Sequence, residues 1–313
     1  MRADSGQINH EGDQGHNGKT LTLSGSFVSF VIVAIHFSRT YMLDKAQRFR
    51  ELHQGPPILV LPNAWDAASA RIFEAEGFRA IATTSAGVAA ALGYPDGGVV
   101  PAREMIEAVA RIARAVTVPV TADIEHAYGA TPDAVADVVL RVIAAGAVGV
   151  NIEDCLPDAV DLEPLTLQAE KIKTVVKAAS TAGVRVVVNA RTDVFLKQVG
   201  APDARLAMAV ERGRAYRAAG ADCVFVPGVA DAGTIALLVR DIAAPINILA
   251  VKGTPSVGEL ESLGVARVSV GSGPMRASLA VVREIARELS ASGTYASFTE
   301  RALAYDDLNA LMR

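Results

Sequence analysis

The chain has 313 residues, of which 51% are hydrophobic and 20% are charged, and its formal net charge is −4. This composition supplies a sizeable apolar core, and no basic block is present to suggest a nucleic-acid or anionic-membrane partner. The two cysteines, Cys155 and Cys223, are too few for a disulfide framework. They predict a protein of the reducing cytoplasm.

Residues 1–41 differ in composition from the rest of the chain. A polar stretch that ends at Lys19 precedes the apolar run LTLSGSFVSFVIVAIHF (21–37), which is short for a membrane span and contains three serines. It lacks the basic segment and cleavage site of a clear signal peptide. We therefore expect 1–41 to be an extension upstream of a true start at Met42, with a disordered tail or an export signal as alternatives. Residues 42–313 are expected to form one domain.

From Pro57 onward, short β-branched runs alternate with Ala-rich helical stretches. This alternation predicts βαβ units joined into a parallel sheet. The continuous apolar character of the runs fits strands that are covered on both faces. The eight predicted strands are 58–64, 80–86, 119–125, 149–154, 184–193, 223–228, 246–251 and 267–271.

The segments between these strands carry helix signals. Thr131 is a predicted N-cap followed by Pro132, and Gly146, Gly220 and Gly264 are predicted helix ends where glycine takes a left-handed conformation without strain. Eight strand–helix units predict a TIM (β/α)8 barrel, whereas no G-x-G-x-x-G follows the first strand to support a dinucleotide-binding sheet. The C-terminal segment adds helices with apolar residues that need covering, so we expect a neighbouring subunit.

Carboxylates gather at the predicted strand ends, where a TIM barrel carries its chemistry. Asp123 and Glu125 end the third strand and, at a spacing of two, are predicted to share one face. Glu153 ends the fourth strand, and Asp96 lies in the loop after the second. Four carboxylates predict a Mg²⁺ site, with Mn²⁺ as the alternative ion, because zinc would need His and Cys ligands that are missing.

Other polar residues at these strand ends suit an anionic substrate. Arg191 and Asn189, two residues apart in the fifth strand, are expected to contact the substrate. Arg191 is expected to bind a substrate carboxylate, because a guanidinium can bind two oxygens at once. The stretch Ser85–Gly87 offers backbone N–H groups and a hydroxyl to an anionic oxygen.

Two structural interpretations compete with these assignments. Asp123 and Glu125 could instead pair with Arg191 or a lysine in a buried ion-pair network. Asp154 and Asp193 are expected to cap loops rather than to bind a ligand.

From Met42 to about Leu279 the chain resembles the isocitrate lyase/phosphoenolpyruvate mutase superfamily. The motifs that carry the resemblance are LPNAWDAASARIFEAEGF (61–78), TTSAGVAAALGYPDGG (83–98), VTADIEHAYG (120–129), GVNIED (149–154), VNARTD (188–193) and GVARVSVGSGPMRASL (264–279). The resemblance implies a Mg²⁺-dependent barrel that binds an α-keto acid or enolpyruvate. It also implies a last helix swapped between the subunits of a homodimer or homotetramer.

Carried over by motif, the resemblance also implies residue roles. Asp123 would bind the metal directly, and three further carboxylates would hold metal-bound waters. Arg191 would hold the substrate and balance an enolate charge. The remaining assignments are Asp96, Glu125 and Glu153 for the waters, Ser85, Ala86 and Gly87 for substrate contact, and Asn63 and Trp65 for lining the pocket.

The reaction predicted first is Mg²⁺-dependent cleavage or formation of a C–C bond in a 2-hydroxy or 2-oxo dicarboxylic acid through an enolate. The alternatives are a phosphonomutase or phosphonopyruvate hydrolase that acts on a P–C bond, and a barrel that binds small acids without turnover. The residues that select the leaving group depart from the superfamily pattern. Cys155 comes too early in EDCLPDAVDLEPLT (153–166) to match the lyase cysteine, and Pro227 stands where mutases carry a histidine.

Overall fold

The computed structural model describes residues 40–156 and 161–313. The prediction for the N-terminal extension therefore lies outside the described residues, apart from Thr40 and Tyr41. Tyr41–Arg313 forms one compact unit. A helix over residues 40–51 leads into the first strand.

Within the described part of the chain, the centre of this unit is a parallel sheet of nine strands. Each strand pairs with two neighbours, except the two end strands, β1 and β2. β1 pairs with β9 and β2 pairs with β3, and only Pro62 separates β1 from β2. The two ends of the sheet are thus one stretch of chain, so the sheet is a barrel. The strands are β1 (Leu59–Leu61), β2 (Asn63–Ala64), β3 (Ile81–Thr83), β4 (Val120–Asp123), β5 (Gly149–Glu153), β6 (Val187–Arg191), β7 (Cys223–Phe225), β8 (Ile246–Leu249) and β9 (Arg267–Ser269).

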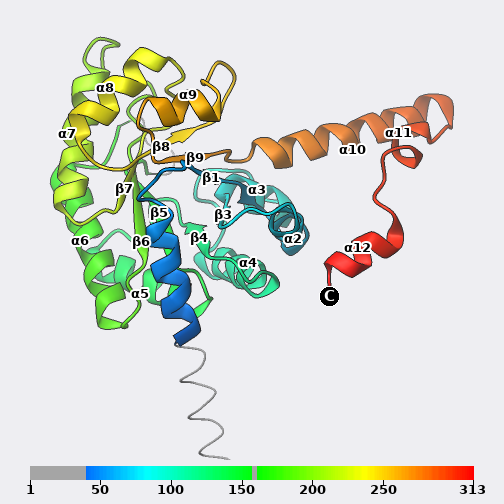
Figure 1. The fold of residues 1–313 in the computed structure, drawn as a ribbon, viewed down its shortest axis with the longest axis horizontal. Helices are drawn as coiled ribbons and strands as arrows, with labels where there is room; N and C mark the ends of the chain where they lie inside the picture. The colour runs from blue at the N-terminus through cyan, green and yellow to red at the C-terminus, as the bar shows by residue number, and fades with distance from the viewer. Residues whose placement is uncertain (1–39, 157–160) are drawn as a thin grey trace, which may run out of the picture. The chain divides into compact units, whose positions relative to one another are not determined.

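Helices connect consecutive strands and surround the sheet (Figure 1). They begin where the sequence places caps: the Thr131 hydroxyl accepts from Ala134 N, and Gly146 ends the following turn with φ 99°. The helices are α2 (Ala67–Ala75), α3 (Ser85–Leu92), α4 (Ala102–Ala115), α5 (Pro132–Ala144), α6 (Leu165–Thr181), α7 (Arg205–Ala218), α8 (Ala232–Ile242), α9 (Val257–Ser262), α10 (Gly273–Ser292), α11 (Ala296–Thr299) and α12 (Tyr305–Leu311).

The predicted TIM barrel is confirmed, and each of the eight predicted strands is present in shortened form. Two boundaries differ in ways that matter for the site. β3 ends at Thr83, and the Thr84 side chain caps a helix that begins at Ser85. β4 ends at Asp123, and Glu125 lies beyond it with φ 52°. The argument that Asp123 and Glu125 share one face of a strand was therefore wrong, because strand alternation does not extend to Glu125.

Alternation within the strands separates core from site. Val150 and Ile152 of β5 and Ala190 of β6 are fully buried in the largest apolar cluster, between sheet and helices. The residues between them, Asn151 and Arg191 among them, line a cavity instead. Alternate side chains of these strands therefore pack against the outer helices, and the side chains between them face the cavity inside the barrel.

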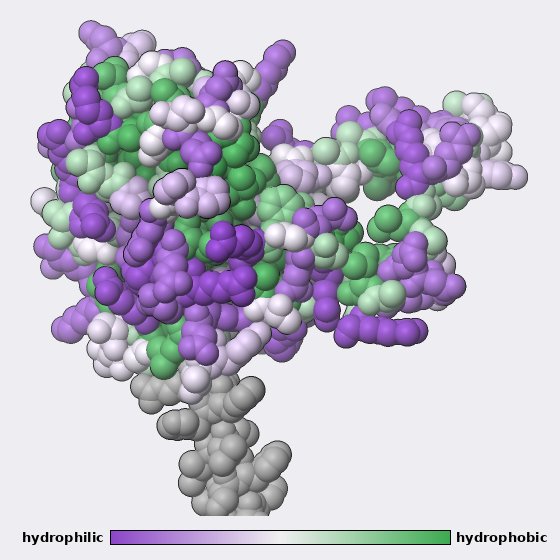
Figure 2. Space-filling model, viewed as in Figure 1, coloured by the Kyte–Doolittle hydropathy of each residue, from purple (hydrophilic) through white to green (hydrophobic). Residues whose placement is uncertain are grey.

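The C-terminal segment makes little contact with this core. α10 follows β9 and leads away from the sheet (Figure 1), and Met275 is its one buried residue. Leu279, Val282 and Leu289 are exposed, and Figure 2 shows hydrophobic residues at the surface of the segment that carries α10–α12. Among the described residues, no helix combines the length and apolar character needed to cross a membrane.

Candidate active site

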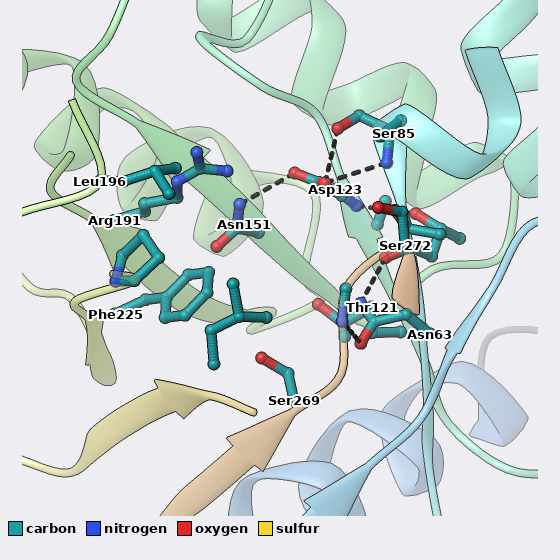
Figure 3. Close-up of a pocket in the computed structure, with 18 of the residues that line it drawn as sticks. Asn63, Ser85, Thr121, Asp123, Asn151, Arg191, Leu196, Phe225, Ser269 and Ser272 are labelled. Carbon is teal, nitrogen blue, oxygen red and sulfur yellow. Dashed lines mark hydrogen bonds between the residues drawn. The ribbon is translucent and has the colours of Figure 1, made fainter. Parts of the chain in front are cut away.

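A cavity of about 150 Å³ opens among the strand ends, and a second of about 470 Å³ adjoins it. Ser85, Asp96, Arg191 and Leu196 line both. Asp123 and Asn151 face the first cavity (Figure 3). The lining of the second includes Glu125, His126, Glu153, Cys155 and Lys197. The barrel therefore brings most of the predicted site residues to one end.

Asp123 is held in place from two sides. Its Oδ2 accepts hydrogen bonds from the Ser85 backbone N–H (3.0 Å) and hydroxyl (2.8 Å), and its Oδ1 accepts from Asn151 Nδ2 (2.9 Å), as Figure 3 shows. Asn189 Nδ2 in turn donates to Asn151 Oδ1 at 2.9 Å. The Ser85 N–H belongs to the first turn of α3, which favours a negative charge there. The carboxylate is thus fixed before any ligand arrives.

Arg191 is fixed by two carboxylates. Its Nη1 lies 2.7 Å from Glu153 Oε2, and its Nε and Nη2 donate to the two Asp193 oxygens at 2.6 and 3.0 Å. Burial opposes the guanidinium charge, but Glu153 and Asp193 outweigh it and raise the pKa of Arg191. These bonds use three of its five N–H groups, so two remain for a ligand. The predicted pairing of Asp123 or Glu125 with Arg191 is not what the structure contains.

Asp154 and Asp193 belong to a buried network that supports Arg191. Asp154 Oδ1 accepts from the Asp193 backbone N–H (2.9 Å), and its Oδ2 accepts from Tyr216 Oη (2.6 Å) and Arg212 Nη1 (3.0 Å). Asp154 therefore does bind loop backbone, as predicted, but Asp193 binds the Arg191 side chain rather than a loop. Tyr216 and Arg212 lie on α7, and no motif in the sequence pointed to them.

Glu125 carries the least compensated charge in the site. It is 3% exposed, and no hydrogen bond of good geometry reaches either of its oxygens from the described residues, although the Gly98 N–H and the Tyr128 hydroxyl lie near enough to lower its pKa. Burial raises its pKa to about 7, and the charges of Asp123 and Asp96 add to the rise. Burial also raises the pKa of Glu153 well above its usual range. Such crowding of carboxylates is a property of functional sites and of cation sites.

The predicted cluster of four carboxylates is not preassembled. Within residues 40–156 and 161–313, no three acidic, histidine or cysteine side chains form a group able to hold a metal ion by themselves. One reason is that Glu153 is paired with Arg191. Mg²⁺ commonly takes one or two protein carboxylates directly and keeps several waters. A fixed Asp123 beside a buried, unpartnered Glu125 fits that mode of binding.

Three predicted ligand contacts lie away from the cavities. Neither Trp65 nor Gly87 is part of the lining, and a Cβ on Gly87 would lie 2.9 Å from Trp65 Cβ and 2.6 Å from Thr84 Cγ2. Gly87 thus permits close packing of α3 on the β1–β2 segment. Asn189 lies behind Asn151. Asn63 and Ala86 do line the first cavity, and Asn63 Oδ1 also accepts from the backbone N–H groups of Val270 and Gly271 (2.9 Å each).

Comparison with known proteins identifies the family. Residues 49–290 match the profile of the family described as Phosphoenolpyruvate phosphomutase. The chain belongs to this family. A solved structure with a similar fold, that of a candidate lyase/mutase from Burkholderia cenocepacia J2315, has 36% sequence identity to this chain and a TM-score of 0.81. It covers 86% of this chain and 96% of its own.

Two sequence relatives extend the comparison. An uncharacterised protein of Mycobacterium tuberculosis (strain ATCC 25618 / H37Rv) is 40% identical over 267 residues, 83% of this chain and 97% of the relative. A 2-methylisocitrate lyase of Halalkalibacterium halodurans is 28% identical over 288 residues, 86% of this chain and 92% of the relative. The predicted superfamily is confirmed, and its members are lyases and mutases that act on C–C or P–C bonds.

Proposed function

We propose that this protein is a Mg²⁺-dependent lyase that cleaves or forms a C–C bond in a 2-hydroxy or 2-oxo dicarboxylic acid through an enolate. The observation that carries the proposal is that a fixed carboxylate, Asp123, and a half-buried arginine, Arg191, line the same cavity at the strand ends. A divalent cation bound to Asp123 and the guanidinium of Arg191 would place two positive charges beside one developing oxyanion.

The cation would be held by Asp123, with Glu125, Asp96 and Glu153 placed to receive its bound waters. Bound there, Mg²⁺ would act as a Lewis acid toward a substrate carbonyl oxygen. The unpartnered Glu125 oxygens and the crowding of carboxylates support this role.

The chain's own groups would then orient the acid. Arg191 has two N–H groups free for a substrate carboxylate or enolate oxygen, and Glu153 and Asp193 keep its plane fixed. Ala86 lines the same cavity, and its backbone N–H in the first turn of α3 offers a further donor, whereas the Ser85 N–H and hydroxyl already donate to Asp123. Leu196 and the Phe225 ring, whose centroid lies 5.8 Å from Arg191 Cζ, close one side with apolar surface and exclude water.

The charges that line the second cavity indicate which leaving group the site would accept. Its lining holds four acidic side chains, Asp96, Glu125, Glu153 and Asp193, against two cations, Arg191 and Lys197. A doubly charged phosphonate would be repelled there more strongly than a carbonyl or a single carboxylate. This balance favours C–C over P–C chemistry. The family match itself favours the second candidate, a phosphonomutase or phosphonopyruvate hydrolase.

A substrate screen distinguishes the candidates. The purified protein with Mg²⁺ would be incubated with candidate dicarboxylic acids and with phosphonopyruvate, and the release of pyruvate or glyoxylate would be measured against that of phosphate or phosphoenolpyruvate. Release of an oxo acid from a dicarboxylate supports the proposal. Turnover of phosphonopyruvate alone would establish the second candidate, and Mg²⁺-dependent oxalate binding without any turnover would indicate a binding protein. We also propose that α10 mediates a homodimer or homotetramer, which light scattering would measure.

A further inference from the structure

Arg267 is a buried cation without a partner. It is 2% exposed, its Nε and Nη1 are shut off from solvent, and its guanidinium makes no hydrogen bond with any described residue. By contrast, the fully buried Lys171 is paired with Glu163 at 2.5 Å, and the buried Lys45 donates to the Val116 carbonyl oxygen. A buried charge is normally paired or hydrogen-bonded, because burial removes the water that stabilises it. The described residues therefore supply no acceptor to the Arg267 guanidinium, which leaves room for an acceptor from a ligand.

Its position points that charge into the active-site cavity. Arg267 is the first residue of β9, whereas Asp123 and Arg191 are the last residues of β4 and β6. Because all strands run parallel, Arg267 lies deeper in the barrel than the two site residues, yet it lines the same cavity. The cavity thus has one guanidinium at its mouth and another toward its closed end.

The groups packed against Arg267 are neutral, and the carboxylate that acts on its charge, Asp123, lines the same cavity without forming an ion pair with it. Its strand neighbours in register are Leu59 and Asn247, and the Asn247 Nδ2 is buried without a partner. Burial raises the pKa of Cys223 to about 12 and lowers that of His53 to about 3, so both stay neutral near pH 7. Burial lowers the pKa of Arg267 itself only to about 10, so its charge remains. An excess of unpartnered N–H groups around one positive charge is complementary to an anion.

We propose that Arg267 anchors an internal anion subsite that binds the second carboxylate of a dicarboxylic acid whose first end lies at Arg191. The identity of the acid rests on the proposed function, but the subsite itself rests on the unpartnered guanidinium. A cavity of about 150 Å³ accommodates a small organic molecule. Arg267 would then select diacids over monoacids of equal length, because a monoacid leaves the buried charge unpaired.

Calorimetry on the full chain tests the subsite with succinate as the probe and butyrate as the matched monoacid, each with Mg²⁺ and again with a chelator. Wild-type protein is expected to bind succinate at least about tenfold more tightly than butyrate, with and without the metal. R267M should remove that preference to within about twofold. R50M is the matched control, because Arg50 is already paired with Asp222, and it should keep the wild-type preference.

Oxalate separates this inference from the proposed function, because it is too short to extend from Arg191 to the closed end. R267M should leave Mg²⁺-dependent oxalate affinity within about twofold of wild type. If wild-type protein fails to bind oxalate, the proposed metal site is contradicted, while the succinate preference still decides the role of Arg267. Equal wild-type affinities for succinate and butyrate, or an unchanged preference in R267M, would overturn the subsite.

A wild-type measurement covers the case in which R267M is insoluble. Crystals of the wild-type protein soaked in bromide should show an anomalous peak within hydrogen-bonding distance of the Arg267 guanidinium. Water alone at that position, with bromide bound elsewhere, would overturn the inference.

Discussion

Replacing Arg191 with lysine keeps the positive charge and removes the planar guanidinium. The wild-type side chain makes three charge-assisted hydrogen bonds, at 2.7 Å to Glu153 and at 2.6 and 3.0 Å to Asp193. A single ammonium cannot reproduce both pairings, so one carboxylate loses its partner. Asp193 is 1% exposed and Glu153 is 15% exposed.

The magnitude follows from which carboxylate is left unpaired. Breaking a buried ion pair costs about 3–5 kcal/mol, and losing one hydrogen bond to a charged group costs about 1.5–3 kcal/mol. The raised pKa of Glu153 lets that group take up a proton and limits the loss, so we expect the lower part of the range, about 3 kcal/mol. Urea denaturation of R191K and wild-type protein measures the change in the free energy of unfolding.

Arg240 provides a control with the same geometry at the surface. Its Nε and Nη2 donate to the two Asp241 oxygens at 2.7 and 2.8 Å, and its side chain is 69% exposed. R240K should leave the stability almost unchanged, since water replaces the lost bond. Equal effects of R191K and R240K would refute the reasoning, because the Arg191 side chain is 16% exposed and paired with two carboxylates, whereas the Arg240 side chain is 69% exposed and paired with one. R191K should also weaken Mg²⁺-dependent oxalate binding by at least about tenfold.

Two further substitutions test packing and charge in the barrel by thermal and urea denaturation. Gly87→Ala should destabilise the protein by about 1–3 kcal/mol, because the new Cβ would lie 2.6 Å from Thr84 Cγ2, whereas Gly258→Ala meets nothing within 4 Å and should be neutral or stabilising. An equal effect at both glycines would contradict the packing argument. Burial and nearby arginines hold the pKa of His53 at about 3, so the unfolded state binds its proton first as the pH falls below about 6.5. Stability should therefore fall by roughly 2 kcal/mol between pH 6.5 and 4.5, and His53→Gln should remove most of that fall; an unchanged pH profile would count against a buried neutral histidine.

The sequence predicted the barrel because its strands are continuous apolar runs separated by helix caps and glycine stops, and those signals are local. It placed Asp123 correctly at a strand end for the same reason. It misplaced Ser85 in a strand, since Thr84 follows an apolar run but caps a helix. It also put Glu125 in a strand, although φ of 52° turns the chain there.

Pairings across the barrel could not be predicted in the same way. Glu153 meets Arg191 because β5 and β6 are in register at these two residues, and register depends on the whole sheet. Tyr216 reaches Asp154 from a helix more than sixty residues later in the chain. Arg267 did carry a signal, a charged residue opening the strand RVS, but its lack of a partner is visible only in three dimensions.

The proposed function requires that Asp123, oriented by Ser85, holds a divalent cation beside the position where Arg191 receives the substrate acid. Calorimetric titration of oxalate into wild-type and Asp123→Ala protein, each with and without Mg²⁺, tests it most directly. We predict that wild-type protein binds oxalate only with Mg²⁺, and that Asp123→Ala, with an unchanged circular dichroism spectrum, does not bind it at all. Oxalate binding that persists in the folded Asp123→Ala protein, or that ignores Mg²⁺ in the wild type, would contradict the claim.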